Sequence, residues 1–292
     1  MRRGGWQDPT QRGAARNVTT VTLTTDFGTA DGYVGAMKGV IASIEPRARI
    51  EDLTHEIPAQ DVQAAGYALY RSVPYWPDGT VHCAVIDPGV GSLRRAVAAR
   101  AESGQYLVGP DSGVFTLFCP PFTDREPEAV ELTETRWWRD PNAASATFHG
   151  RDVFAPVAAH LARMILDGEP DLSVFGPPVA ELERFDLPTP VEERGGGYRG
   201  EVLHVDHFGN AVTNLPERWV IHSGGQAIVE AGGKSMPVVR TYSDVAVGDL
   251  CAVVGSTGWL EVACRDGSAA SRLGLAAGQP VVLKATSAGR GA

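Results

Sequence analysis

The chain has 292 residues, of which 43% are hydrophobic and 21% are charged, a composition typical of a soluble globular protein. This length allows one large domain or two smaller ones. The net charge of −9 argues against a partner with a phosphate backbone, and no apolar run approaches the ~20 residues that span a bilayer. We therefore expect neither a nucleic acid nor a membrane as partner.

Residues 1–17 include Arg2 and Arg3 but lack the apolar stretch that a signal peptide needs. We interpret this segment as a disordered leader and expect a cytoplasmic protein. The four cysteines form no CxxC pair, which is typical of buried free thiols in a reducing compartment.

Short β-branched runs alternate with helical patterns over residues 18–187, which we expect to form one domain. Asp61 can cap the second helix and Pro74 stops it. Predicted strands cover 18–25, 48–53, 80–86, 96–100 and 106–108, and predicted helices cover 33–44, 62–73 and 151–166. This alternation favours an α/β fold with a mainly parallel sheet.

The composition changes after Phe185, where a connector rich in Pro and Gly leads into short β-rich runs. These runs cover 200–205, 211–214, 227–230, 250–254 and 260–263. Glycines separate them, and no long helical pattern accompanies them. We therefore predict a smaller C-terminal β-barrel domain over residues 198–288.

Asp26 ends the first predicted strand, within the turn Asp26-Phe27-Gly28. Ligands of open α/β sheets bind at the carboxyl ends of the strands, where this carboxylate could accept two hydrogen bonds from a ribose diol. The same letters do not indicate a protein kinase, because no HRD-like loop and no preceding Gly-rich loop exist. Taken alone, Asp26 is more typical of a turn or a helix cap.

Asp87 and Arg94 flank a turn after the third predicted strand and could meet across it, although such a pair alone is more often a surface ion pair. The turn lacks a full GxGxxG, so it gives little support to a dinucleotide site. His149 opens the long helix, where the neutral imidazole is favoured and suits a base or an orienting donor. A solvated or capping histidine is the simpler alternative there.

The segment around Asp206 is dense in hydrogen-bonding side chains. Phe208 offers an aromatic face to a purine, and Asn210 could contact a base edge. We expect no metal site here, because the neighbouring histidines lie on a strand whose side chains alternate in direction. Ser256 lies in a turn that could hold a carboxylate, although alone this is an ordinary hairpin turn.

The order and spacing of these segments are more specific than any one of them. The series reads TDFGTADGYVGAMKGVI, VIDPGVGSLRR, TFHGRDVFAPVAAHLA, VDHFGNAVTNL and STGWLEVACRDGSAA. From about residue 18 to about residue 283, it resembles the S-adenosyl-L-methionine hydroxide adenosyltransferases, relatives of fluorinase and chlorinase.

The resemblance implies a homotrimer with active sites between subunits. It also implies that S-adenosyl-L-methionine is the substrate, hydrolysed to adenosine and L-methionine by attack of water or hydroxide on the ribose C5′, with no cofactor and no metal. Asp26 would bind the ribose hydroxyls. Asp206 and Ser256 would hold the methionine amino and carboxylate groups, and Phe208 and Asn210 would contact the adenine.

Asp87, Arg94 and His149 match the triad that marks the hydroxide-using branch of this family. Water is a poor nucleophile that needs a general base or cationic stabilisation of hydroxide, whereas a halide arrives charged. The halogenating relatives carry other residues here, so the triad disfavours a halogenase. A non-catalytic sensor of S-adenosylmethionine or adenosine is the other alternative, and it would not need the triad.

Three positions depart from the family pattern, each with another residue where an asparagine is usual. They are Ser112, Gly255 and Arg265. The departures leave the expected reaction class unchanged and bear on the affinity and the adenine contacts.

Overall fold

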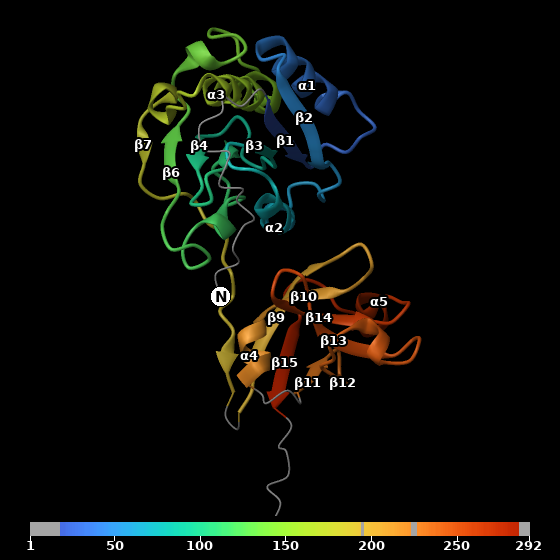
Figure 1. Cartoon of the computed structure of the whole chain (residues 1–292). Coiled ribbons are helices and arrows are strands. Elements are labelled where there is room, and N and C mark those ends of the chain that lie inside the picture. The colour runs from blue at the N-terminus through green and yellow to red at the C-terminus, as the bar shows by residue number, and fades with distance from the viewer. Residues whose placement is uncertain (1–17, 194–195, 223–226, 286–292) are drawn as a thin grey trace, which may run out of the picture. The chain divides into compact units, whose positions relative to one another are not determined.

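The computed structural model describes residues 18–193, 196–222 and 227–285, and the segment 1–17 that we interpret as a leader lies outside them. The chain divides into two compact units between Phe185 and Asp186. Both are drawn in Figure 1. Every helix within the described ranges is too short or too polar to cross a bilayer.

The N-terminal unit is built on a seven-stranded sheet with the order β2-β1-β3-β5-β4-β6-β7. The strands are β1 (Thr19–Thr25), β2 (Ala48–Thr54), β3 (Val81–Val85), β4 (Ala96–Arg100), β5 (Tyr106–Pro110), β6 (Glu128–Glu131) and β7 (Pro178–Val179). Pairing is parallel from β2 to β5 and antiparallel from β5 to β7. The predicted α/β class is confirmed, with the antiparallel half formed by short strands late in the unit.

Helices cover both faces of this sheet (Figure 1). They are α1 (Tyr33–Ile44), α2 (Val62–Ser72) and α3 (Ala155–Asp167), the last preceded by the π-helical turn η5 (Gly150–Phe154). Helices α1 and α3 share one apolar core with alternate residues of β1 and β3, and α2 contributes to a second core on the opposite face. Because β3 lies between two cores, its five residues are all buried.

The predicted start of α2 is confirmed in detail. The carboxylate of Asp61 accepts a hydrogen bond of 2.9 Å from the backbone N–H of Ala64, which satisfies one of the free donors at the helix start. The predicted bounds of α1 agree with the structure at both ends. The long helix predicted over 151–166 differs, because its first turn is π-helical.

The C-terminal unit is a nearly closed barrel of antiparallel strands in the order β12-β11-β15-β9-β10-β14-β13, with β8 beside β9. The strands are β8 (Val191–Glu192), β9 (Tyr198–Val205), β10 (Ala211–Pro216), β11 (Ala227–Ala231), β12 (Lys234–Pro237), β13 (Leu250–Val254), β14 (Trp259–Cys264) and β15 (Pro280–Ala285). A bridge between Val238 and Ala252 links the two ends of the sheet. This unit confirms the predicted β-barrel and adds two short helices, α4 (Glu217–His222) and α5 (Ala269–Leu273).

All four cysteines are buried and free. Cys83 and Cys119 lie in the N-terminal unit, and burial raises the pKa of each thiol to about 12. These thiols are therefore protonated and unreactive at neutral pH.

Candidate active site

Two candidate carboxylates lie at the carboxyl ends of neighbouring parallel strands. Thr25 at the end of β1 is in register with Val85 at the end of β3. Asp26 follows the first of these residues directly, and Asp87 follows the second by two positions. The topology therefore brings the two motifs to one edge of the sheet, where ligands of open α/β sheets bind.

The side chains of Asp87, Arg94 and His149 are joined by hydrogen bonds. Arg94 Nε donates to Asp87 Oδ1 over 2.8 Å, and Arg94 Nη2 donates to Asp87 Oδ2, which makes a bidentate pair. Nη2 also lies 2.7 Å from Nδ1 of His149. The side chains of Asp87 and Arg94 are only 7% and 12% exposed, so this is not the surface ion pair that the sequence also allowed.

The turn between Asp87 and Arg94 needs its glycines for this geometry. A Cβ atom on Gly89 would lie 2.9 Å from Cγ of Arg94, and one on Gly91, at φ +77°, would lie 2.7 Å from the carbonyl oxygen of Ala146. The guanidinium of Arg94 also lies over the ring of Phe154, 5.3 Å from its centroid. The turn is thus packed tightly enough to fix the arginine.

The contact with Arg94 determines the protonation state of His149. A guanidinium can only donate, so Nδ1 must accept, and the proton of the neutral imidazole is on Nε2. Burial first, and then the positive charge of Arg94, lower the pKa of His149 below its ordinary value. The imidazole is therefore neutral at physiological pH and offers an N–H donor on its Nε2 side.

A buried carboxylate holds the turn that carries His149. Asp152 in η5 is fully buried and accepts hydrogen bonds from Arg139, Arg151 and the backbone N–H of Ser145. Burial alone would raise its pKa, but the bonds from the two arginines hold that pKa well below the usual range. The charged Asp152 thus ties η5 to the loop before it.

An aromatic cluster, made of Phe27, Tyr33 and Phe148, joins the Asp26 turn to the His149 turn. The ring centroids of Phe27 and Phe148 are 5.8 Å apart, and those of Tyr33 and Phe148 are 5.2 Å apart. These rings were not among the residues predicted for the site, although all three stand inside the quoted motifs. Their positions next to the candidate polar residues were the available signal.

Asp26 itself is held by the connection between β2 and α2. Its Oδ2 accepts a hydrogen bond of 2.8 Å from the backbone N–H of Gln60. Among the described residues, no group donates to Oδ1. The carboxylate is partly buried and keeps one oxygen available for an incoming hydroxyl.

In the C-terminal unit, Asp206, Phe208 and Asn210 lie in one tight loop between β9 and β10. Asp206 Oδ1 accepts from the backbone N–H of Phe208 and of Asn210, both at 2.9 Å, and Oδ2 accepts from Asn210 Nδ2 at 3.1 Å. Asn210 is buried, whereas the ring of Phe208 is 74% exposed. The loop therefore presents a largely exposed aromatic ring beside a carboxylate.

Ser256 lies in a different loop, the turn between β13 and β14. Glu261 lies next to Gly255 at the start of this turn, and Tyr242 contacts Glu261. Tyr242 donates to Glu261 Oε2 over 3.4 Å, and burial together with the charge of Glu261 and that of Asp206 raises the pKa of Tyr242 to about 12. The structure thus brings Asp206, Phe208 and Asn210 together in one loop, and Ser256 belongs to another loop of the same unit.

The three departures from the family pattern each have a local structural setting. A Cβ atom at Gly255 would lie 1.8 Å from Oε1 of Glu261, so an asparagine there would displace the glutamate. Ser112 donates to the carbonyl oxygen of Ile86 over 3.2 Å, just before Asp87. Arg265 donates to the carbonyl oxygen of Val245 over 2.7 Å.

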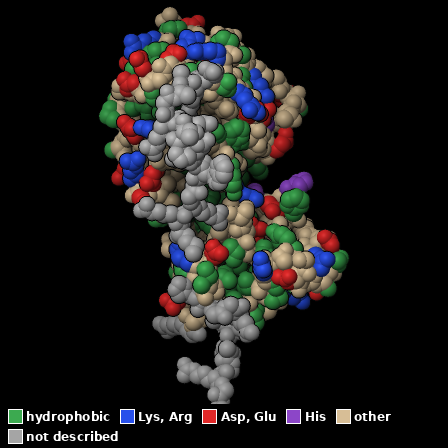
Figure 2. All heavy atoms as spheres, in the orientation of Figure 1, with side chains coloured by type: hydrophobic (Ala, Val, Ile, Leu, Met, Phe, Trp, Pro, Cys, Tyr) green, Lys and Arg blue, Asp and Glu red, His purple; other side chains and the backbone are tan. Residues whose placement is uncertain are grey.

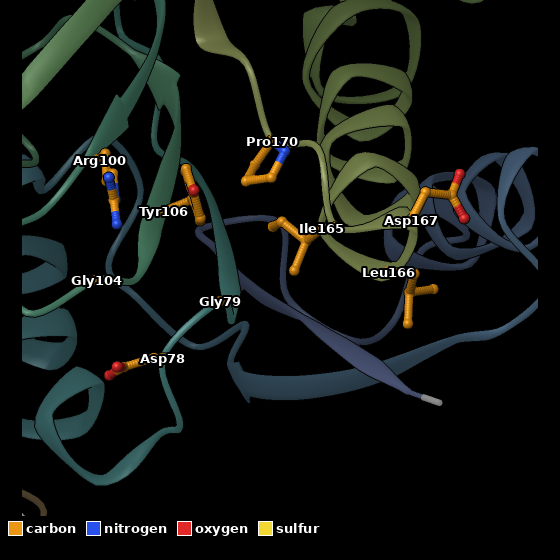
Figure 3. A pocket seen from close by; sticks show the side chains of 10 residues that line it. Asp78, Gly79, Arg100, Gly104, Tyr106, Ile165, Leu166, Asp167 and Pro170 are labelled. Carbon is orange, nitrogen blue, oxygen red and sulfur yellow. The ribbon is translucent and has the colours of Figure 1, made fainter. Parts of the chain in front are cut away.

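One hollow of the N-terminal unit lies away from these residues, with a volume of about 390 Å³. Figure 3 shows it between the start of β3, the start of β5 and the end of α3, with Asp78, Arg100 and Asp167 among its lining residues. This is the amino-terminal edge of the strands, opposite to Asp26 and Asp87.

Acidic and basic side chains are interspersed on the face drawn in Figure 2.

No group of three or more His, Cys, Asp or Glu side chains is arranged to hold a metal ion within the described ranges. The described ranges include His204, Asp206 and His207, which form no such group.

Known proteins match both units. The family model described as the SAM hydroxide adenosyltransferase N-terminal domain matches residues 21–167, and the corresponding C-terminal domain matches residues 200–282. A Thermus thermophilus protein named (R)-S-adenosyl-L-methionine hydrolase is 45% identical over 272 residues, which cover 90% of this chain and 98% of the relative. A fluorinase of an Actinoplanes species is 27% identical over 297 residues, covering 90% and 96%. The crystal structure of an uncharacterized conserved protein from Thermotoga maritima matches with a TM-score of 0.81 at 34% identity, covering 90% of this chain and 99% of that one.

Proposed function

Because the chain belongs to the SAM hydroxide adenosyltransferase family, we propose that it hydrolyses S-adenosyl-L-methionine to adenosine and L-methionine. The observation that carries this proposal is the hydrogen-bonded set of Asp87, Arg94 and His149. A protein that only bound S-adenosylmethionine would not need this hydrogen-bonded set. The greater identity to the relative named a hydrolase, 45% against 27% for the fluorinase, also favours water over halide as the nucleophile.

The sulfonium is a good leaving group, so the reaction requires a nucleophile positioned in line with the C5′–S bond. The oxygen of water forms the C5′–O bond while the C5′–S electron pair goes to sulfur, and one proton is released to solvent. The charge of Arg94 stabilises the hydroxide character of the attacking oxygen. His149, with its proton on Nε2, acts as an orienting donor rather than as a base. Asp87 keeps Arg94 in place.

The substrate contacts divide between the two units. Asp26 takes the ribose hydroxyls on the side where Oδ1 has no hydrogen bond among the described residues. The exposed ring of Phe208 and the amide of Asn210 contact the adenine. Asp206 holds the ammonium group through its remaining lone pairs, and Ser256 holds the carboxylate.

The sulfonium centre is chiral, and the hydrolase relative is named for the (R) epimer. We extend this preference to the present chain. Its physical basis would be in-line geometry, because inverting the sulfonium changes the direction of the methionine chain relative to the C5′–S bond.

A homotrimer would bring the two sets of contacts together, with the N-terminal unit of one chain and the C-terminal unit of its neighbour around one substrate. Two exposed apolar side chains at the candidate residues support this assembly. Leu93, in the turn before Arg94, is fully exposed, and Phe208 is largely exposed. Light scattering should give the mass of three chains, and a monomer that keeps full activity on dilution would contradict the assembly.

The activity is tested by incubating the purified protein with each separate sulfonium epimer in ¹⁸O-labelled water. Adenosine with the label at O5′ and methionine are expected, faster from the (R) epimer. The yield should be the same with a chelator and with added fluoride or chloride. A 5′-halogenated nucleoside would indicate a halogenase, and tight binding with no product would indicate a sensor.

A further inference from the structure

Strand β1 carries two buried threonine–histidine pairs. Thr25 Oγ1 lies 2.8 Å from Nδ1 of His55, and Thr22 Oγ1 lies 2.7 Å from Nδ1 of His82. All four side chains are buried. Only the first pair adjoins the turn that carries Asp26.

His55 contacts that turn at two points. Its carbonyl oxygen accepts a hydrogen bond of 2.8 Å from the backbone N–H of Gly28. Its ring contacts the hydroxyl of Thr25, which itself accepts from the backbone N–H of Phe27 over 3.2 Å. With the imidazole proton on Nε2, the threonine hydroxyl donates to Nδ1 of His55 while it accepts from Phe27.

The other side of the ring faces a charged pair. His55 Nε2 lies 3.0 Å from Asp52 Oδ1, in a direction that departs from the ideal line of the N–H bond. The other oxygen of this carboxylate, Asp52 Oδ2, accepts a hydrogen bond of 2.6 Å from Lys38 Nζ. Burial alone would raise the pKa of Asp52, but the contacts with Lys38 and His55 lower it overall. The negative charge of Asp52 favours the Nε2–H form and so the acceptor at Nδ1.

The same segment also holds the carboxylate of Asp26 directly. The backbone N–H of Gln60 donates to Asp26 Oδ2, and Gln60 adopts a left-handed φ of +64° to do so. Residues 55–60 thus bond the Asp26 turn through a side chain, a carbonyl oxygen and a backbone N–H.

We propose that His55 is a positioning residue for recognition of a ribose diol, because it fixes the turn from Thr25 to Gly28 and so the carboxylate of Asp26. This inference rests on the proposed role of Asp26. His55 is buried and makes no contact with the substrate itself.

The test compares the binding of adenosine and 2′,3′-dideoxyadenosine by calorimetry. The wild-type protein should bind adenosine at least about tenfold more tightly, because a charged carboxylate accepts the two hydroxyls. His55→Ala should reduce this ratio toward one, as Asp26→Ala does, and the double variant should lose no more than either single one. His82→Ala is the matched control: it removes the other pair from β1 and should keep the wild-type ratio.

Two milder variants separate positioning from stability. In His55→Asn, the amide oxygen replaces Nδ1 as acceptor of the Thr25 hydroxyl, so the preference for adenosine should be largely restored. In His55→Gln, the amide reaches the Nε2 position and leaves Thr25 without its acceptor, so the preference should stay low. These variants decide the matter if His55→Ala does not fold.

An unchanged ratio in His55→Ala, with a loss of melting temperature equal to that of His82→Ala, would make His55 purely structural and overturn the proposal. A wild-type protein that does not prefer adenosine would overturn it as well. A wild-type protein that prefers adenosine, responds to His55 substitution and yet fails to hydrolyse S-adenosylmethionine would refute the proposed function and leave this inference standing.

Discussion

The two units hold their candidate residues with different kinds of bond. In the N-terminal unit, Arg94 bonds His149 across 55 positions of sequence, and Gln60 bonds Asp26 across 34. In the C-terminal unit, Asp206 bonds partners no more than four positions away. Long-range bonds fix the N-terminal residues before any ligand arrives, whereas the local bonds shape one loop and leave the ring of Phe208 exposed. We therefore expect changes in the set of Asp87, Arg94 and His149 to affect rate, and changes in the C-terminal loop to affect affinity.

The largest effect is expected from His149→Ala. Turnover should fall about 10²- to 10⁴-fold, the range typical of losing an acid–base or orienting group, while binding of S-adenosylmethionine stays within about tenfold. Single-turnover rates and calorimetric titration measure the two quantities. His160→Ala, from the same helix but in contact with Trp137, is the matched control and should keep the wild-type rate. Lost binding with an intact chemical step would place His149 among the binding residues instead.

Asp87→Ala should resemble His149→Ala, because both act through Arg94. Removing Asp87 frees the guanidinium that His149 also contacts. The double variant should therefore cost less than about tenfold beyond either single one, since groups that act as a unit are not additive. Multiplicative losses in single-turnover rates would show that the two residues act independently.

A smaller effect, on affinity rather than rate, is expected from Asp206→Ala. The variant removes the carboxylate proposed to hold the substrate ammonium, and a hydrogen bond to a charged group contributes about 1.5–3 kcal/mol, so the Kd should rise about tenfold or more. Calorimetry with S-adenosylmethionine measures this change. Asp244→Ala, which removes a carboxylate from another loop of the same unit, should leave the Kd unchanged. An equal loss in both variants would point to a general effect of charge.

The smallest effect is expected from mild acid. His149 must be neutral to accept from Arg94, and its pKa is lowered from the ordinary 6.5. Activity is therefore present above that lowered pKa and is lost as the pH falls through it. Between pH 7.5 and 6.5, kcat should fall less than about twofold. A half-maximal point above pH 6.5 would mean that the Arg94 contact does not hold in solution.

Local sequence patterns were enough to predict the helices and strands whose bounds are determined by their own residues. Helix α1 has a regular apolar stripe and a proline just beyond its end, and both of its bounds agree with the prediction. The short strand β7 and strand β15 were not predicted, because each is defined by partners far along the chain. Strands β4 and β5 were predicted as strands, but the local pattern does not show that they run antiparallel to each other.

In the candidate site too, some features could be predicted from local sequence and others depend on contacts with distant residues. Sequence position placed Asp26 and Asp87 at strand ends and His149 at a helix start, as the structure does. It could not show that Arg94 bonds Asp87 and His149 together, because these contacts depend on the complete fold. The support that His55 gives to Thr25 was also invisible, since an isolated histidine after a strand carries no distinguishing pattern.

The π-helical turn before α3 determines how His149 is rotated relative to that helix. In η5 the backbone N–H of Ala155 donates to Gly150, five residues back, so this turn holds one residue more than a regular helix would need. If the same residues wound with ordinary α geometry instead, His149 would be rotated by about 100° around the helix axis, away from Arg94. The wide turn therefore accommodates the extra residue and keeps the imidazole aligned with the guanidinium. Deleting one residue here would restore ordinary α geometry and leave His149 near its present orientation, whereas a substitution that enforced regular winding at full length would misalign it.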